Sequence, residues 1–139
     1  MQPKDLMDEA IEIYKKQLKA TRPASIKDDD FSPKNKHKVN VFIAITADDY
    51  ELKLTTQENY ELVIATEEPL ETKVYITAYS FFGARHALET LSQLIVWDES
   101  IPALLIMKHA EIKDSPAFPH RGLLIDTSRN YVSVPMIKK

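Results

Sequence analysis

The residues best suited to chemistry lie near the end of the chain, where Arg121 precedes a short apolar run and Asp126 and Arg129 follow it. A guanidinium group offers five N–H donors in a fixed fork and stays charged at any working pH. Residue chemistry alone favours a structural role for Arg121, either as a bridge between two domains or as the partner of Asp126. The Asp-x-x-Arg spacing of Asp126 and Arg129 is typical of an ion pair that closes a loop after a strand.

Residue types exclude several kinds of site. The sequence has no cysteine, so neither a thiolate nucleophile nor a thiolate metal site can form. Its two glycines, Gly83 and Gly122, cannot build a glycine-rich phosphate loop. Structural roles are expected for His86, His109 and His120, because no H-E-x-x-H metal spacing is present. A G-x-S-x-G motif is also missing, which argues against an unrelated serine hydrolase. We expect neither a metal nor a cofactor.

Composition narrows the class of protein further. The 139 residues are 44% apolar, which is enough for one hydrophobic core of ordinary size. The 18 Lys and Arg residues against 21 Asp and Glu give a net charge of -3, and this balance argues against nucleic-acid binding. No apolar run approaches the ~18–20 residues that span a bilayer. The first residues turn acidic at once and lack the layout of a signal peptide.

Apolar periodicity predicts the elements that must position these residues. Pro3–Ala20 has apolar residues at helical spacing and lysines toward its C-terminal end, which predicts an amphipathic helix. A second helix should run from Phe81 to Ile95, with Ser80 as its N-cap. Strands are predicted where the apolar pattern has a period of two or forms a short run, at residues 39–46, 50–54, 60–64, 73–77 and 101–107.

These elements predict an α+β fold, an α/β sandwich, over residues 1–113. Short strands with short polar connections are typical of an antiparallel meander, so a mostly antiparallel sheet should carry both helices on one face. The polar connection between the first helix and the first strand contains Asp28–Asp30. We expect a solvated loop there, because the ligand spacing and the turn glycine of a calcium-binding loop are missing.

Residues 114–139 do not fit into that domain. The segment 114–119 is a proline-punctuated linker, and Leu123–Ile125 is continuously apolar, as in a strand buried on both faces of a parallel sheet. Such a strand needs a crossover connection and neighbours on both sides, which the few residues after it cannot supply. We therefore expect a chain that is cut at the start of a second domain.

Two stretches of the sequence are more specific. Phe118–Tyr131, with the sequence FPHRGLLIDTSRNY, closely resembles the opening of the catalytic barrel in family 20 glycoside hydrolases, the β-N-acetylhexosaminidases. Thr77–Ile95 is similar to the second helix of the small domain that precedes the barrel in that family. The resemblance implies a zincin-like N-terminal domain (a fold name that implies no metal) followed by the first β-strand of a truncated (β/α)8 barrel.

The resemblance also implies an activity. Members of the family remove terminal β-linked N-acetylglucosamine or N-acetylgalactosamine (GlcNAc or GalNAc) from chitooligosaccharides or glycan chains. The reaction is a substrate-assisted retaining hydrolysis, in which the 2-acetamido oxygen of the sugar is the nucleophile. The family's catalytic Asp-Glu pair belongs to a later part of the barrel, so the resemblance implies no catalytic residue in this chain. We expect the chain alone to be inactive.

For the site residues, the resemblance reverses the first interpretation of Arg121. The family's arginine at this position binds hydroxyl groups of the terminal sugar, and a forked guanidinium suits a pair of neighbouring hydroxyls. Asp126 and Arg129 would lie at the C-terminal end of the barrel strand, the side on which barrel active sites are built. They could support the residues that touch the sugar or form the loop-closing ion pair, and the second reading is favoured.

The implied partners are an oligosaccharide that ends in GlcNAc or GalNAc and the remainder of the catalytic barrel, and a homodimer stays open. No nucleic acid and no membrane span are expected. The family resemblance implies a secreted or lysosomal location. The alternative from another class is a non-catalytic protein, either a truncated product or a free-standing α/β domain that binds carbohydrate or a protein partner.

Overall fold

A computed structural model describes residues 3–25, 37–47, 50–67 and 71–138. The predicted loop Asp28–Asp30 therefore lies outside the described residues. None of the helices in the described part of the chain is long and apolar enough to cross a bilayer. The helices are α1 (Pro3–Ala20), α2 (Phe81–Gln93) and α3 (Val134–Ile137), and the strands are β1 (Lys38–Ile45), β2 (Tyr60–Glu67), β3 (Glu71–Ala78), β4 (Ile95–Asp98), β5 (Ala103–Ile106) and β6 (His109–Asp114).

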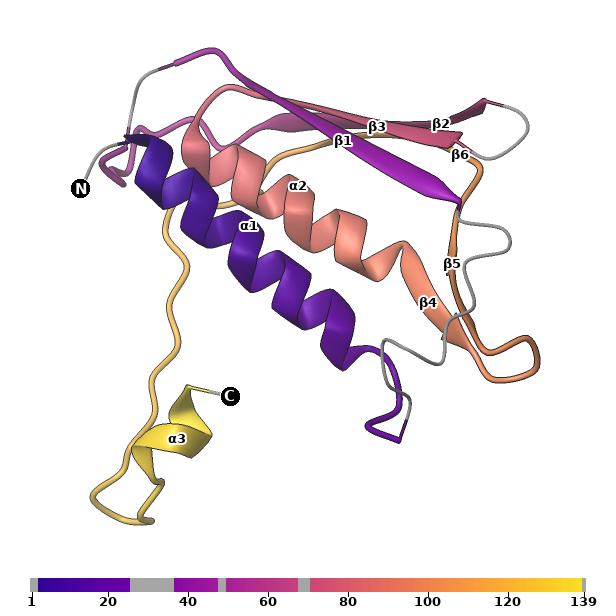
Figure 1. The fold of residues 1–139 in the computed structure, drawn as a ribbon. Coiled ribbons are helices and arrows are strands. Elements are labelled where there is room, and N and C mark those ends of the chain that lie inside the picture. The colour runs from indigo at the N-terminus through magenta and orange to yellow at the C-terminus, as the bar shows by residue number, and fades with distance from the viewer. Residues whose placement is uncertain (1–2, 26–36, 48–49, 68–70, 139) are drawn as a thin grey trace.

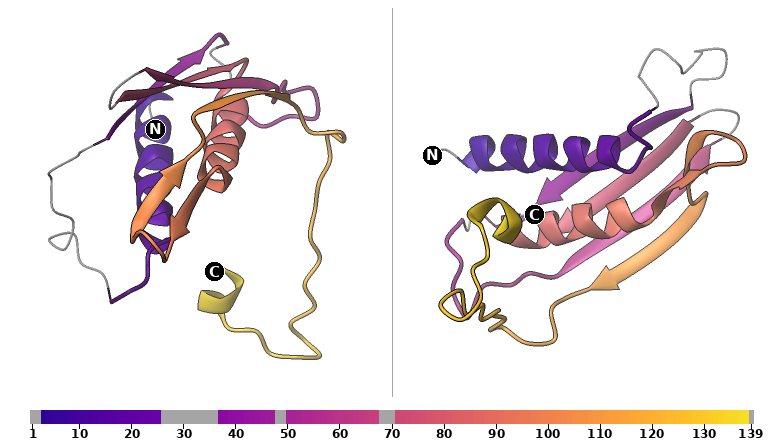
Figure 2. Two further views of the ribbon diagram at one scale, coloured as in Figure 1. Left: turned by 90° about the vertical axis from the view of Figure 1, so that its right-hand side faces the viewer. Right: turned by 90° about the horizontal axis from the view of Figure 1, so that it is seen from below.

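Four of the strands form one sheet, in the order β1-β3-β2-β6. β2 pairs antiparallel with both β3 and β6, whereas β1 pairs parallel with β3. The helices α1 and α2 lie side by side on one face of this sheet (Figures 1 and 2). The strands β4 and β5 form a separate antiparallel hairpin. The predicted α+β domain with two helices on one face of the sheet is confirmed.

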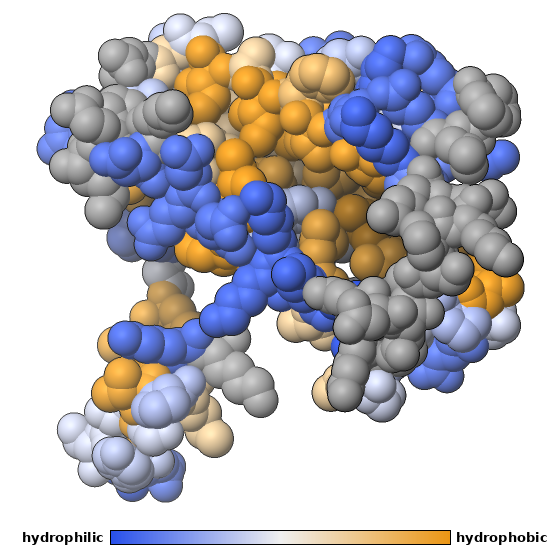
Figure 3. Space-filling view, viewed as in Figure 1, coloured by the Kyte–Doolittle hydropathy of each residue, from blue (hydrophilic) through white to orange (hydrophobic). Residues whose placement is uncertain are grey.

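The core lies between the sheet and the two long helices. Burial alternates along most of β2 and along β3, so that one face of each strand is mostly buried, with Leu62 and Val74 inaccessible to solvent. α2 contributes Ala84, Ala87 and Leu91 from its buried side. Figure 3 shows hydrophilic side chains along the outer side of α1 and apolar residues gathered between α1 and the sheet. This arrangement is the one that an amphipathic helix predicts.

The start of α2 follows the sequence prediction, and its end does not. Ser80 has an extended backbone, and its hydroxyl accepts a hydrogen bond from the backbone N–H of Gly83 at 3.4 Å, as an N-cap does. The helix ends at Gln93 rather than at Ile95. The β-branched and aromatic run that follows pairs as β4 with β5, so strand pairing takes over the end of the apolar pattern.

The expected antiparallel meander is wrong in its connections. Residues 50–54 form no strand, and the hydroxyl of Thr56 binds the backbone of Lys53 and Glu51 in a turn. β1 pairs parallel with β3, where a meander would place an antiparallel neighbour. The predicted strand at 101–107 is shorter and lies in the hairpin, outside the main sheet. β6, which the sequence analysis missed, occupies the edge beside β2. Alternation marks a segment as able to form a strand, but its partner depends on the whole fold.

The tail leaves the sheet after β6 and runs away from it to α3 (Figure 2). The predicted strand at Leu123–Ile125 is not formed, and the side chains of Leu123 and Leu124 are 86% and 94% exposed. No strand among the described residues pairs with this segment. A single apolar run cannot form a strand without a neighbour to bond its backbone groups. The expected barrel strand is therefore absent from this structure.

Candidate functional site

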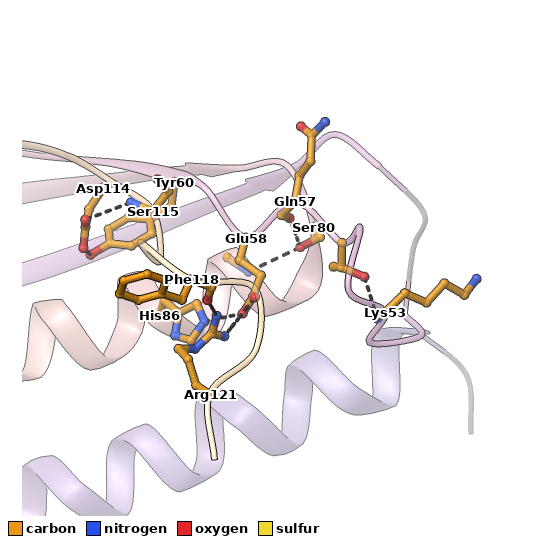
Figure 4. A network of polar contacts seen from close by, with 12 residues as sticks. Lys53, Gln57, Glu58, Tyr60, Ser80, His86, Asp114, Ser115, Phe118 and Arg121 are labelled. Carbon is orange, nitrogen blue, oxygen red and sulfur yellow. Dashed lines mark hydrogen bonds and ion pairs between the residues drawn. The ribbon is translucent and has the colours of Figure 1, made fainter.

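The most distinctive polar cluster is built around Glu58, which lies just before β2. Its two carboxylate oxygens, Oε1 and Oε2, accept hydrogen bonds from Nη2 of Arg121 at 2.8 and 2.7 Å. Nε2 of His86, on α2, lies 2.7 Å from Oε2. The Glu58 side chain is only 7% exposed. Figure 4 shows the three side chains converging from three parts of the chain. The cluster joins the α+β domain to the tail, since Arg121 lies 63 residues beyond Glu58.

Backbone contacts hold the segment around Glu58 against the first turn of α2. The hydroxyl of Ser80 donates to the carbonyl oxygen of Gln57 at 2.6 Å, and the N–H of Tyr79 donates to the carbonyl oxygen of Asn59 at 3.2 Å. Ser80 therefore caps the helix and ties down the residue before Glu58 at the same time. These bonds fix the backbone on both sides of Glu58, and its carboxylate starts from a defined position.

Gly83 makes this close approach possible. A Cβ atom at Gly83 would lie 2.7 Å from the carbonyl oxygen of Asn59 and 3.1 Å from that of Glu58. Both atoms belong to the backbone, so no side-chain rotation can relieve the contact. A glycine here allows the segment 57–59 to pack directly on the helix.

The same face of α2 carries further polar contacts. His86 and Thr90 follow Gly83 at helical spacing, so the three positions lie on one side of the helix. The hydroxyls of Thr90 and Tyr60 are 2.6 Å apart, and the Tyr60 hydroxyl also donates to Oδ2 of Asp114 at 3.2 Å. Asp114 is the last residue of β6, so this network secures the point at which the tail begins.

Electrostatics favours the ionised form of Glu58. Burial of the carboxyl group by itself would raise the pKa of Glu58, but hydrogen bonds from Arg121 and His86, together with their charges, outweigh that effect. The pKa of Glu58 is therefore lower in the folded protein than its ordinary value. A carboxyl group whose pKa is lower in the folded than in the unfolded protein stabilises the fold at pH values above the unfolded pKa. This stabilisation is lost as the pH falls through the folded pKa.

The lowered pKa of Glu58 predicts how the stability of the chain changes with acid pH. At pH 7 the variant Glu58→Gln should melt several degrees below the parent chain, because it loses the charge that pairs with Arg121. Below the unfolded glutamate pKa of about 4.3 the difference should begin to shrink, because Glu58 takes up a proton in the unfolded parent chain, and it should shrink further as the pH falls through the lower folded pKa. Thermal unfolding of both chains between about pH 7 and pH 3 measures it. The matched control is Glu99→Gln, at an exposed position in the β4–β5 turn. A difference that stays constant over this pH range would contradict the prediction.

The structure separates the three residues that the sequence singled out. Arg121 joins the Glu58 cluster, and its Nη1 also donates to the carbonyl oxygen of Phe118 at 2.6 Å. Asp126 and Arg129 instead pair with each other at 3.3 Å, with side chains that are 49% and 88% exposed. The hydroxyl-binding role of Arg121 stays a prediction. In this structure the charged partner of Arg121 is Glu58, whereas Asp126 pairs with Arg129, so the alternative in which Arg121 pairs with Asp126 is not seen among the described residues.

Glu58 is not among the site residues that the sequence predicts. Thr55-Thr56-Gln57-Glu58-Asn59 has no periodicity and no recognisable spacing, and a single glutamate in such a segment is usually exposed. One signal was available in the sequence of α2, where Gly83 and His86 interrupt the pattern of large apolar side chains at a spacing of three residues. A glycine and a polar residue on one face of a helix indicate that a backbone segment approaches there.

An open groove of about 260 Å³ lies beside this cluster, lined in part by Gln57, Glu58, Pro119 and Arg121. The Arg121 side chain is 42% exposed, so its guanidinium can contact a polar ligand while it stays paired with Glu58. Among the described residues, no group of three His, Asp or Glu side chains is arranged to hold a metal ion. The guanidinium of Arg121 can therefore donate hydrogen bonds to a ligand in the groove.

Comparisons with known proteins place these observations in a family. Residues 2–94 match a family described as "beta-acetyl hexosaminidase like". A chitooligosaccharidolytic beta-N-acetylglucosaminidase from Bombyx mori is 37% identical over 137 residues, which cover 97% of this chain and 22% of that protein. The alignment leaves out only a few residues of this chain, so the aligned range extends past Arg121.

Two further relatives match over shorter stretches. A chitooligosaccharidolytic beta-N-acetylglucosaminidase from Ostrinia furnacalis is 55% identical over 64 residues, 46% of this chain and 11% of that protein. The beta-hexosaminidase subunit beta of Mus musculus is 44% identical over 69 residues, 50% of this chain and 12% of that protein. The chain thus spans about a tenth to a fifth of the length of these curated relatives.

Proposed function

The chain belongs to the beta-acetyl hexosaminidase-like family, and from this membership we propose that the protein carrying it is an exo-β-N-acetylhexosaminidase. The substrates would be oligosaccharides that end in β-linked GlcNAc or GalNAc, among them chitooligosaccharides. The observation that carries the proposal is the family match over residues 2–94, which continues into the alignment with the Bombyx mori enzyme across Arg121.

The proposed reaction is a retaining hydrolysis assisted by the substrate. The 2-acetamido oxygen attacks the anomeric carbon, the glycosidic bond breaks, and a general acid protonates the leaving oxygen. The two Asp-Glu dipeptides of this chain are poor candidates for that acid. Asp8-Glu9 lies exposed on α1, and Asp98-Glu99 lies at the β4–β5 turn, where Asp98 binds Ser100. The family's catalytic pair is therefore proposed for the barrel, outside these residues.

Arg121 is proposed to bind hydroxyl groups of the terminal sugar. Its exposure, its place beside the groove and the donors that it offers support this role. Asp126 and Arg129 are proposed to close a loop as an ion pair, in agreement with their mutual contact.

The domain boundaries, the location and the oligomeric state of the protein are also part of the proposal. We propose a small domain over residues 1–113 and a second unit that begins with 114–139; the end of β6 at Asp114 supports this boundary. The barrel would be the neighbour of the small domain within the same protein. A secreted or lysosomal location and a homodimer extend the proposal by family resemblance.

The experiment that tests the function compares two proteins on one substrate. The full-length protein should release the chromophore from an aryl β-N-acetylglucosaminide, whereas the purified 139-residue chain should not exceed a buffer blank. Arg121 alone supplies neither a general acid nor an oriented nucleophile, and together these contribute most of such an acceleration. Activity of the chain that persists through further purification would contradict the assignment of catalysis to the barrel. A full-length protein without activity would favour the non-catalytic alternative.

A further inference from the structure

The contact between Glu58 and Arg121 suggests how the small domain takes part in substrate binding. We infer that Glu58 is a positioning residue, which holds the guanidinium of Arg121 in the orientation that meets the hydroxyl groups of the terminal sugar. The inference rests on the proposed function of Arg121. It assigns to the α+β domain a direct part in the sugar site, through one carboxylate.

The geometry of the guanidinium supports this role. Nη2 is held by both oxygens of Glu58, and Nη1 is held by the carbonyl oxygen of Phe118, so two of the three nitrogens have fixed partners (Figure 4). Nε makes no hydrogen bond to any residue that the structure describes. Two attachment points fix the plane of a guanidinium, and the N–H groups that are left can be offered to a ligand.

Glu58 is itself held more firmly than a surface carboxylate. Ser80, Tyr79 and Gly83 fix the backbone of residues 57–59, and His86 binds the carboxylate from the side of α2. Preorganised partners of this kind lower the cost of orienting a binding group when the substrate arrives.

The Glu58–Arg121 pair differs from the Asp126–Arg129 pair in how far solvent reaches its charges. Arg129 is largely exposed and Asp126 is about half exposed, and such pairs contribute little because solvent competes for both charges. Glu58 is almost fully buried, so a change in its partner leaves a carboxylate that cannot be resolvated easily. The orientation of Arg121 therefore depends on Glu58, whereas no buried carboxylate among the residues that the structure describes holds Arg129.

The test uses the full-length protein and the variants Glu58→Gln, Glu58→Asp and Arg121→Ala. Glu58→Gln should lower kcat/KM for an aryl N-acetylglucosaminide by about fivefold, because the amide keeps the shape and loses the charge. Glu58→Asp should recover part of the loss. Adding Glu58→Gln to Arg121→Ala should cause no further loss, since Glu58 acts only through the arginine. The matched control is Glu111→Gln, at an exposed position on β6, which should leave kcat/KM unchanged.

A purely structural role predicts other results. Glu58→Gln would then lower the melting temperature and leave kcat/KM as it was, and this outcome would overturn the inference. Substrate analogues that lack one ring hydroxyl at a time add a second readout. The penalty of Glu58→Gln should disappear for the analogue that lacks the hydroxyl bound by Arg121, and an equal penalty on all analogues would also count against positioning.

The kinetics of the variants also distinguish a failure of the proposed function from a failure of the inference about Glu58. If Arg121 does not touch the sugar, Arg121→Ala will keep the parent's kcat/KM, whatever Glu58→Gln does. If only the inference fails, Arg121→Ala will lose activity while Glu58→Gln keeps it. Should Glu58→Gln fail to fold, Glu58→Asp and His86→Gln change the same contact more mildly, and the comparison of kcat/KM with melting temperature is made on them.

Discussion

Replacement of Arg121 by alanine in the full-length protein should lower kcat/KM by about tenfold to a hundredfold. Hydrogen bonds to a charged group contribute roughly 1.5–3 kcal/mol each, and the variant removes those that the guanidinium is proposed to make with the sugar. Arg121→Lys should restore only part of the activity, because one ammonium group cannot reproduce the forked donors. Steady-state kinetics on the aryl glycoside measures both variants.

Stability cannot decide this prediction, and kinetics can. Arg121→Ala removes a partner of the buried Glu58 carboxylate, so the melting temperature should fall whether or not the arginine binds the sugar. The control is Arg85→Ala, the same change at an exposed arginine on α2, which should keep the parent's kcat/KM. A folded Arg121→Ala enzyme with the kcat/KM of the parent would remove Arg121 from the sugar site.

The second large effect is expected on stability, from Gly83→Ala. The added methyl group would lie 2.7 Å from the carbonyl oxygen of Asn59, so either α2 or the segment around Glu58 must move. Overpacking of this kind costs about 1–3 kcal/mol. Alanine gains at most about 1 kcal/mol over glycine in a helix, so the clash should outweigh the gain in propensity. Urea unfolding of the 139-residue chain measures the difference.

Gly122→Ala is the matched control for this prediction. The nearest atom to a Cβ at Gly122 is Nε2 of His120, at 3.7 Å, which is an ordinary contact with a side chain. The free energy of unfolding should change by less than about 0.5 kcal/mol there. If Gly83→Ala unfolds at the same urea concentration as the parent or at a higher one, the close approach between α2 and residues 57–59 is not needed for stability.

The elements that sequence predicted well are those whose signals are local. α1 and the start of α2 follow from helical apolar spacing and from the N-cap at Ser80, since both depend on residues within a few positions of each other. β2 and β3 contain the predicted strand residues 60–64 and 73–77, and each strand is longer in the structure than its apolar pattern indicated. The sequence patterns of residues 77–95 and 118–131 also indicated the family, which the comparisons confirm.

Pairing and polar partners were decided by the tertiary structure. The parallel contact of β1 with β3, the hairpin of β4 and β5 and the edge strand β6 depend on which neighbours the whole fold offers. Leu123–Ile125 has a strand-like sequence and forms no strand, because no strand in the described part of the chain lies beside it to pair with it.

The candidate site divides in the same way. Sequence alone identified Arg121 as the candidate sugar-binding residue, because it carries forked N–H donors and lies within the family-like motif of residues 118–131. Its partner Glu58 lies 63 residues earlier, in a segment without any pattern, and His86 reaches it from a third element. A contact between such distant residues is fixed only when the sheet, the helix and the tail pack together, so folding alone could show which carboxylate holds the arginine.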